Sequence, residues 1–202
     1  MAKLSVTKLT DRIIKGNLKK WFESATKEEI QSGLTWYKDA QDFSKYLSKK
    51  YDIDTYTCAT VVSCLSPNNK WERNKIDAET VIKAHINGIA PDSIKVCTYN
   101  NNKLKAFRCL NGETISEKAP KTHAFAMNVG LLSSDHITID KWHLRACVLK
   151  PNDVIKDCTE TVTALQYRRI EKITAQLSKE YNLKGYELQA IIWVTIKNSW
   201  NR

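Results

Sequence analysis

Two side chains of opposite charge mark the part of the chain that is best suited to chemistry. Lys121 begins an apolar stretch, and Asp140 directly follows the apolar run Ile137–Ile139. A neutral amine forms a Schiff base with a sugar carbon when a partly desolvated site lowers its pKa. A fixed carboxylate stabilises the positive charge that develops on a sugar as its bond to a base breaks, or activates the nucleophile. Lys121 and Asp140 are therefore candidate catalytic residues for chemistry at a nucleic-acid base.

The spacing of apolar residues predicts the helices that must position this pair. Helical periods run through most of the 202 residues, and only six glycines and four prolines interrupt them, which indicates an all-α protein. The run 55–65 is apolar enough for a buried strand or a buried helix, and its neighbours favour the helix. Thr26 and Glu29 have the spacing of a capping box at the start of the second helix, and the periodicity of that helix turns Tyr46 inward. Gly33 is a point at which this helix can break. Gly112 suits the C′ position after the helix that ends at residue 110. The predicted helices cover residues 11–24, 26–50, 55–65, 71–85, 103–110, 120–129, 140–149, 159–181 and 184–199, with a short helix opening at Pro91.

The charge of the chain indicates an anionic partner. Thirty-two basic residues against 22 acidic residues give a net charge of +10. Lysine and arginine gain affinity for DNA by releasing counterions from its phosphates. The alternative is a solvated lysine-rich surface, since the basic residues are dispersed along the chain.

Cysteine spacing and hydropathy indicate where the protein works. The six cysteines include no C-x-x-C pair and no zinc-ligand spacing, so we expect a reduced intracellular compartment and neither a metal nor another cofactor. No apolar run approaches the roughly 20 residues of a membrane helix, and the first residues lack the core of a signal peptide. We expect a soluble cytoplasmic protein, favoured as a monomer, that makes no membrane contact.

Several short motifs follow one another in a fixed order between about residues 57 and 147. They are Leu65–Asn68 (LSPN), Asn74, Lys105-Ala106, Pro120–Thr122 (PKT) before an apolar helix, and Ile139–Arg145 (IDKWHLR). This order and spacing resemble the helix-hairpin-helix DNA glycosylase superfamily, in particular its endonuclease III type. The matching family motifs are leucine-serine-small-glutamine, lysine-alanine, lysine-threonine-alanine after a hairpin, and valine-aspartate-threonine-histidine followed by an arginine. The resemblance covers slightly less than half of the chain, and the compact, lysine- and asparagine-rich form is similar to small phage-encoded members, which would act in the host cytoplasm.

The resemblance implies a fold and an activity. The fold is a single all-α domain, residues 1–202, of two lobes with the site in the cleft between them. One lobe covers about residues 53–139, and the other about 1–52 plus 140–202. The implied activity is that of a DNA glycosylase, with Asp140 as the family's aspartate, that excises a modified or damaged base. Lys121, at the position of the family's lysine, would add abasic-site lyase activity.

Such an enzyme must flip its target base out of the duplex, which requires a wedge and stacking groups. Asn68 stands where the family places a residue that probes the gap left by the base. The full set of candidate DNA-binding residues is Asn68, Asn69, Trp71, Lys105, His143 and Arg145.

The chain departs from the family at two places. The glycine-rich hairpin that precedes the family's lysine and lets backbone amides approach a phosphate is replaced by Ser116–Ala119. The cysteine cluster of the iron–sulfur members is missing, which argues against that cofactor.

Other interpretations remain open at this point. Related viral proteins are implicated in thymine hypermodification, in which an amine replaces a pyrophosphate on the base, and a third interpretation is a non-catalytic DNA-binding module. Asp140 is also a natural helix N-cap, and Lys121 is also an ordinary solvated cation. His143 suits a structural role or a phosphate contact, and Arg145 suits a pair with Asp140 or with a phosphate.

Overall fold

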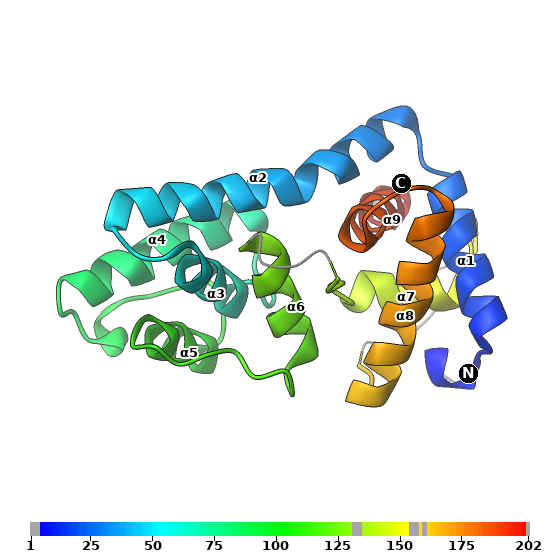
Figure 1. Ribbon diagram of the computed structural model, residues 1–202. Coiled ribbons are helices and arrows are strands. Elements are labelled where there is room, and N and C mark those ends of the chain that lie inside the picture. The colour runs from blue at the N-terminus through cyan, green and yellow to red at the C-terminus, as the bar shows by residue number, and fades with distance from the viewer. Residues whose placement is uncertain (1–4, 131–134, 154–157, 159–160, 201–202) are drawn as a thin grey trace. The chain divides into compact units, whose positions relative to one another are not determined.

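The computed structural model describes residues 5–130, 135–153, 158 and 161–200 (Figure 1). Across these residues it contains nine α-helices and two short 3-10 helices, and no β-strand. The all-α class predicted from the sequence is therefore confirmed. None of the helices in the described ranges has both the length and the apolar character that a bilayer-crossing segment requires.

The chain divides into two compact units, unit 1 (residues 1–38 and 134–202) and unit 2 (residues 39–133). Helix α2 (Lys27–Tyr51) contributes its first half to unit 1 and its second half to unit 2. The lobes expected from the resemblance were about residues 53–139 and about 1–52 plus 140–202. Asp140 belongs to unit 1 and Lys121 to unit 2.

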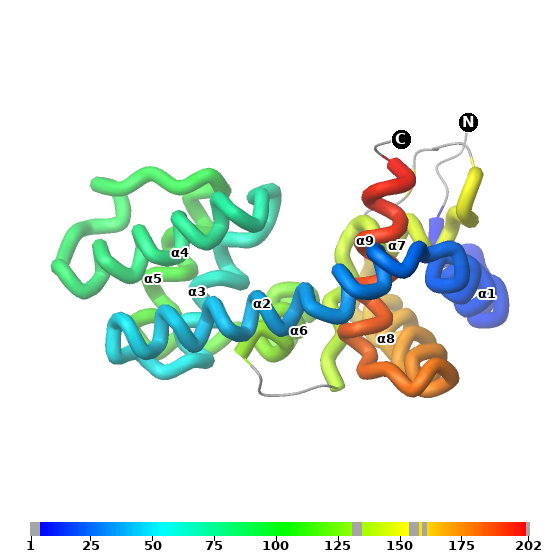
Figure 2. The backbone as a smooth tube through the Cα atoms, turned by 90° about the horizontal axis from the view of Figure 1, so that it is seen from above, coloured from blue at the N-terminus to red at the C-terminus, as the bar shows by residue number. Residues whose placement is uncertain are grey.

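Unit 1 is built around α9 (Gly185–Trp200), which is buried on most of its surface. Three helices pack against it: α1 (Asp11–Glu23), α7 (Lys141–Val148) and α8 (Ala164–Glu180). Helices α1 and α8 also lie side by side (Figure 2). Leu188, Ile192 and Ile196 of α9 are at most 1% exposed and share one apolar cluster with residues of the other three helices. A single core therefore fixes the helices of this unit.

Helix α7 depends on α1. The last carbonyls of a helix have no partner within it. Asn17 of α1 donates its side-chain amide to the carbonyl of Cys147 at 2.9 Å, and Trp21 donates its indole N–H to the carbonyl of Leu149 at 2.8 Å. An isolated helix of this length is unstable in water. The eight residues of α7 are therefore helical because their neighbours hold them.

Capping side chains decide where two of the long helices begin. The capping box predicted for α2 is confirmed, with the Thr26 N–H donating to Glu29 at 3.0 Å and the Glu29 N–H donating to Thr26 at 3.2 Å. Thr163 and Gln166 form a second capping box at the start of α8. This second box places the start of α8 at Ala164 rather than at the predicted residue 159.

Gly33 does not break α2, and the expectation that it can is wrong. The helix is continuous from Lys27 to Tyr51. An added Cβ at Gly33 would lie 2.5 Å from the Cα of Ile191 and 2.6 Å from its backbone nitrogen. The glycine therefore serves a close approach of α2 to α9, which no side chain at this position would permit.

Unit 2 is organised around α3 (Thr55–Leu65), which packs against three other helices, α4 (Trp71–Ile86), α5 (Asn100–Leu110) and α6 (Pro120–Val129) (Figure 1). All eight residues from Cys58 to Leu65 are buried, so the ambiguous apolar run is a central helix, as its neighbours favoured. The hydroxyl of Ser63 donates to the carbonyl of Thr122 at 2.6 Å, and the Asn74 amide donates to the carbonyl of Val62 at 3.1 Å. These bonds tie α3 to α6 and to α4.

The boundaries of α5 and the short helix at Pro91 show how far local sequence signals predict the structure. Helix α5 begins at Asn100, before the predicted residue 103, although three asparagines in a row are typical of a loop. Gly112 has a φ of 92° and follows the last turn of α5, which confirms it as the predicted C′ residue. The 3-10 helix η2 (Pro91–Ser93) confirms the predicted short helix.

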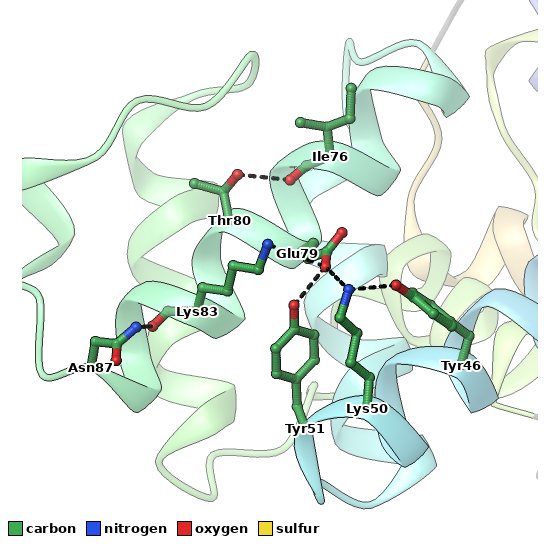
Figure 3. Close-up of polar contacts among 8 residues, drawn as sticks. All are labelled: Tyr46, Lys50, Tyr51, Ile76, Glu79, Thr80, Lys83 and Asn87. Atoms are coloured by element: carbon green, nitrogen blue, oxygen red, sulfur yellow. Dashed lines mark hydrogen bonds and ion pairs between the residues drawn. The ribbon is translucent and has the colours of Figure 1, made fainter.

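Glu79 on α4 joins the last turn of α2 to the rest of unit 2 (Figure 3). Its Oε1 accepts hydrogen bonds from the Lys50 ammonium at 2.6 Å and from the Tyr51 hydroxyl at 2.5 Å, and Lys83 lies at 3.4 Å. The bond from Lys50, followed by that from Tyr51, lowers the pKa of Glu79 to about 2. Lys50 also donates to Tyr46, which is 47% exposed and does not face inward as the periodicity suggested.

Glu79→Gln is expected to lower the free energy of unfolding at pH 7 by about 1 kcal/mol, because the amide loses the charge-assisted bonds. A carboxyl group whose pKa is lowered on folding adds stability above its ordinary pKa of 4.5, and this stability is lost as the pH falls through about 2. Urea unfolding at pH 7 and pH 2.5 should therefore show a smaller difference between variant and wild type in acid. The exposed Glu72→Gln serves as control, and an equal loss in both variants would contradict the assignment.

Candidate functional site

Asp140 is the N-cap of α7. Its Oδ1 accepts the backbone N–H groups of Trp142 at 3.0 Å and of His143 at 2.9 Å. The capping interpretation is therefore confirmed, and capping does not preclude a catalytic role. The cap fixes the carboxylate at the N-terminus of α7, which is the positive end of the helix dipole.

The extended run before Asp140 is held by α8. The Tyr167 hydroxyl accepts the N–H of Ile139 at 3.0 Å and donates to the carbonyl of Ile137 at 2.7 Å. The carboxylate of Glu171 accepts the N–H of Ile137 at 3.1 Å. Burial raises the pKa of Tyr167, so its hydroxyl remains a donor at ordinary pH. Hydrogen bonds on both sides of Asp140 thus make its position rigid.

Arg145 lies against two indole rings that also contact each other. Its guanidinium carbon is 4.6 Å from the ring centroid of Trp142 and 4.5 Å from that of Trp200, and the two rings meet edge to face at 5.3 Å. Lys141 lies 5.9 Å from the centroid of Trp142. An arginine held on aromatic rings keeps its outward N–H groups in a fixed direction, which suits a phosphate. The aromatic partners of Arg145 were not foreseen.

A surface pocket of about 350 Å³ lies between the first turns of α2 and the last turns of α9. Its polar and aromatic lining residues are Glu28, Glu29 and Ser32 of α2, and Trp193, Lys197 and Asn198 of α9. Trp193 packs against Trp36 of α2, with ring centroids 5.7 Å apart. The pocket is within unit 1, which also carries Asp140.

Lys197 is the basic residue of this pocket. Its ammonium nitrogen lies 4.0 Å from the ring centroid of Trp193. Burial lowers the pKa of Lys197, and the negative charge of Asp140 acts in the opposite direction and raises it. Lys197 is thus an amine within the electrostatic reach of the candidate carboxylate. The sequence signal was available, since Lys197 is the one lysine in the apolar stretch 185–200 and follows Trp193 by one helical turn.

His143 belongs to the core. It is 0% exposed, and its Nε2 lies 2.9 Å from the hydroxyl oxygen of Thr174. That hydroxyl donates its only proton to the carbonyl of Ile170 at 2.9 Å, so it accepts from a protonated Nε2 and the ring is the neutral Nε2–H tautomer. Burial lowers the pKa of His143 to about 3. Of the roles considered for His143, the structural one fits a ring that is fully buried and bonded to Thr174.

Unit 2 brings together the residues predicted to probe DNA at the turn between α3 and α4. Asn68 is exposed, has a φ of 55° and donates its amide to the Tyr99 hydroxyl at 2.6 Å. Trp71 is half-buried, with its ring centroid 6.1 Å from that of Phe43. Asn69 donates to Asp77 at 2.9 Å, which makes it part of the turn's own hydrogen bonding.

Asp77 organises that turn and was not singled out by sequence reasoning. It is 0% exposed and accepts from Asn69, from Arg73 at 2.9 Å and from the N–H of Cys97 at 2.8 Å. Arg73, one helical turn earlier on α4, was the available signal. The carboxylate therefore has a structural explanation.

Lys121 is exposed in the first turn of α6. The preceding Ser116–Ala119 segment forms a turn, in which the N–H of Ala119 donates to the carbonyl of Ser116 at 2.9 Å. An exposed amine lacks the desolvated surroundings that a nucleophilic lysine requires. The other basic residue expected at DNA in this unit, Lys105, is half-buried on α5 beside the thiols of Cys64 and Cys109, which are 4.0 Å apart.

No group of three or more histidine, cysteine, aspartate or glutamate side chains suited to a metal ion occurs in the part of the chain that the structure describes. Comparison with known proteins finds no match among curated proteins and none among solved structures. One family model matches residues 1–200, almost the full length of the chain. The chain therefore belongs to DUF7178, a family of unknown function.

Proposed function

We propose that this protein binds DNA and acts on a flipped-out base as a DNA glycosylase, with Asp140 as the catalytic carboxylate. The observation that carries the proposal is the rigid placement of Asp140 on the same short helix as Lys141, Trp142 and Arg145. One helix thereby presents a carboxylate, two cations and an aromatic ring. Each of these has a distinct use at a nucleotide.

The residue types divide the work of such a reaction. A breaking N-glycosidic bond leaves positive charge on the sugar, which a carboxylate that is already fixed stabilises without reorganisation. Arg145 and Lys141 suit the flanking phosphates, and indole rings such as Trp142 stack on bases. The net charge of +10 supports a polyanionic substrate.

Asp140→Asn tests the proposal, because asparagine caps a helix as well as aspartate does but carries no charge. We expect the variant to fold and to bind DNA as the wild type does. Its release of free base should fall by about 100-fold or more. The measurement is mass spectrometry of bases released from duplexes and single strands that contain modified or damaged bases.

Asp54→Asn is the matched control, because Asp54 caps α3 through the N–H of Thr57 at 2.9 Å and is given no catalytic role. It should release base at the wild-type rate. Equal rates in Asp140→Asn and wild type would exclude Asp140 as the catalytic group.

A non-catalytic DNA-binding module is the second candidate, favoured by the use of Asp140 as a cap and by the exposure of Lys121. The logarithm of the DNA-binding constant would then fall linearly with the logarithm of the salt concentration, and no DNA would release a base. Asp140→Asn would be silent in both assays.

A further inference from the structure

Two thiols of unit 2 lie in contact between a pair of packed helices. Cys64 is in the last turn of α3 and Cys109 is in the last turn of α5, which packs along α3. Both are free cysteines, each is 2% exposed, and their sulfurs are 4.0 Å apart. A disulfide bond is about 2 Å long, so the sulfurs must approach by roughly 2 Å, which rotation about the Cα–Cβ bonds supplies. The fold therefore holds the two thiols in a position to be joined.

The two thiols differ in their surroundings. Lys105 lies one helical turn before Cys109 on α5, and its charge favours the ionised form of both thiols. Glu113 acts in the opposite direction on Cys109, although its carboxylate is paired with Arg108 at 2.7 Å. The hydrogen bond from Cys64 lowers the pKa of Cys109 to about 7, against the effect of burial. Donating that bond keeps the proton on Cys64 and raises its pKa. Cys109 is therefore the thiol of the pair that ionises.

Cys58 shows the surroundings of an ordinary core thiol in the same unit. It is 0% exposed on α3, and its sulfur lies 4.0 Å from the carbonyl oxygen of Ile53. Burial raises the pKa of Cys58 to about 12, which leaves it an unreactive thiol. The contact with a second sulfur, on another helix, distinguishes the pair of Cys64 and Cys109 from such simple packing.

Burial of the pair limits which oxidant can reach it. With 2% of each residue exposed, a bulky disulfide such as glutathione disulfide has no room beside the sulfurs. Hydrogen peroxide is uncharged and close to water in size, and it oxidises a thiolate to a sulfenic acid, which condenses with a second thiol. Cys97, in contrast, is exposed and accessible to both oxidants.

We propose that Cys64 and Cys109 are an oxidisable thiol pair that hydrogen peroxide converts into a disulfide within the folded chain. The Cys109 thiolate attacks one peroxide oxygen, the O–O bond breaks, and hydroxide leaves with the proton that Cys109 had lost, as water. The Cys64 sulfur then attacks the sulfur of the resulting sulfenic acid. The S–O bond breaks, and the hydroxyl leaves with the Cys64 proton as a second molecule of water. The two thiols lose two electrons, which the peroxide takes up.

The new bond would constrain the part of unit 2 that carries the turn between α3 and α4. It would join residues that are 45 positions apart, and the closed loop would contain all of α4 and that turn. A cross-link over a loop of this length removes conformational freedom from the unfolded chain. The oxidised protein should therefore unfold at a higher urea concentration than the reduced protein, by roughly 1 M or more.

Peptide mapping of the folded protein after treatment with hydrogen peroxide tests the inference. Remaining thiols are alkylated, the chain is digested without reductant, and the linked peptides are identified by mass spectrometry. We expect one linked pair that contains Cys64 and Cys109, and its loss after reduction with dithiothreitol. Glutathione disulfide should modify Cys97 and leave the pair reduced. No linkage between Cys64 and Cys109 in peroxide, or an equal yield of it with glutathione disulfide, would overturn the inference.

Serine variants separate the roles of the two thiols. In Cys64→Ser the hydroxyl still donates to Cys109 but cannot form the disulfide, so the sulfenic acid should accumulate on Cys109 and be captured by dimedone added with denaturant. Capture on Cys64 in Cys109→Ser should be lower by about tenfold or more. Cys58→Ala is the matched control and should form the linkage as the wild type does. Equal capture in the two serine variants, or an unchanged urea midpoint on oxidation of the wild type, would contradict the proposed order of attack or the constraint on unit 2, respectively.

Discussion

Gly33→Ala is expected to lower the free energy of unfolding by about 2 to 3 kcal/mol. The new Cβ would lie 2.5 Å from the Cα of Ile191 and 2.6 Å from its nitrogen, and backbone atoms inside a helix cannot rotate aside. Helices α2 and α9 would have to move apart, which would open the core around Tyr37, whose hydroxyl donates to Gln189 at 2.9 Å. The better helix propensity of alanine offsets about 1 kcal/mol of this loss.

Gly16→Ala provides the comparison in the same unit. Gly16 is also inside a helix, α1, and an added Cβ would meet nothing within 4 Å. This change should stabilise the protein by up to about 1 kcal/mol. Urea unfolding followed by circular dichroism measures both variants, and similar midpoints would show that the close approach at Gly33 does not limit α2.

His143 is expected to cause a large loss of stability in acid. Its pKa falls from an ordinary value of 6.5 to about 3 on folding. Below pH 6.5 the unfolded chain therefore binds a proton that the folded chain does not, and stability decreases as the pH falls until about 3 is reached. The difference between the two pKa values corresponds to roughly 5 kcal/mol at full effect.

His143→Gln separates this effect from the titration of the carboxylates. Glutamine can still donate to Thr174 but does not titrate, so the variant should be less stable than wild type at pH 7 by about 1 to 3 kcal/mol. The gap should close, and then reverse, as unfolding is measured from pH 7 down to pH 4. His85→Gln, on α4, should leave the pH dependence unchanged, and parallel curves for wild type and His143→Gln would contradict the assignment.

Local signals predicted the helices well where a cap or a proline marks the end. Thr26 with Glu29, and Pro120 with Gly130, lie at helix boundaries because each of these preferences acts within a few residues. Gly33 was misread for the opposite reason. Its meaning depends on Ile191, which is distant in sequence, and no local pattern contains that contact.

The candidate site shows the same division. The cap at Asp140 follows from the residue type and the start of a helix, whereas its rigidity depends on Tyr167 of α8. Lys197 was overlooked because its helix is apolar, and the environment of an amine is set by tertiary packing rather than by its neighbours in sequence. The burial of His143 could not be read from a lone histidine on a short helix.

The dependence of α7 on other helices has a consequence for synthesis. The side chains that hold α7 come from α1, which is made early, and the core beneath it comes from α8 and α9, which are made after it. A nascent chain on the ribosome therefore cannot complete the Asp140 site until α9 has emerged. A chain cut before α9 would therefore contain Asp140 and the helix that it caps but would lack the core on which that helix packs.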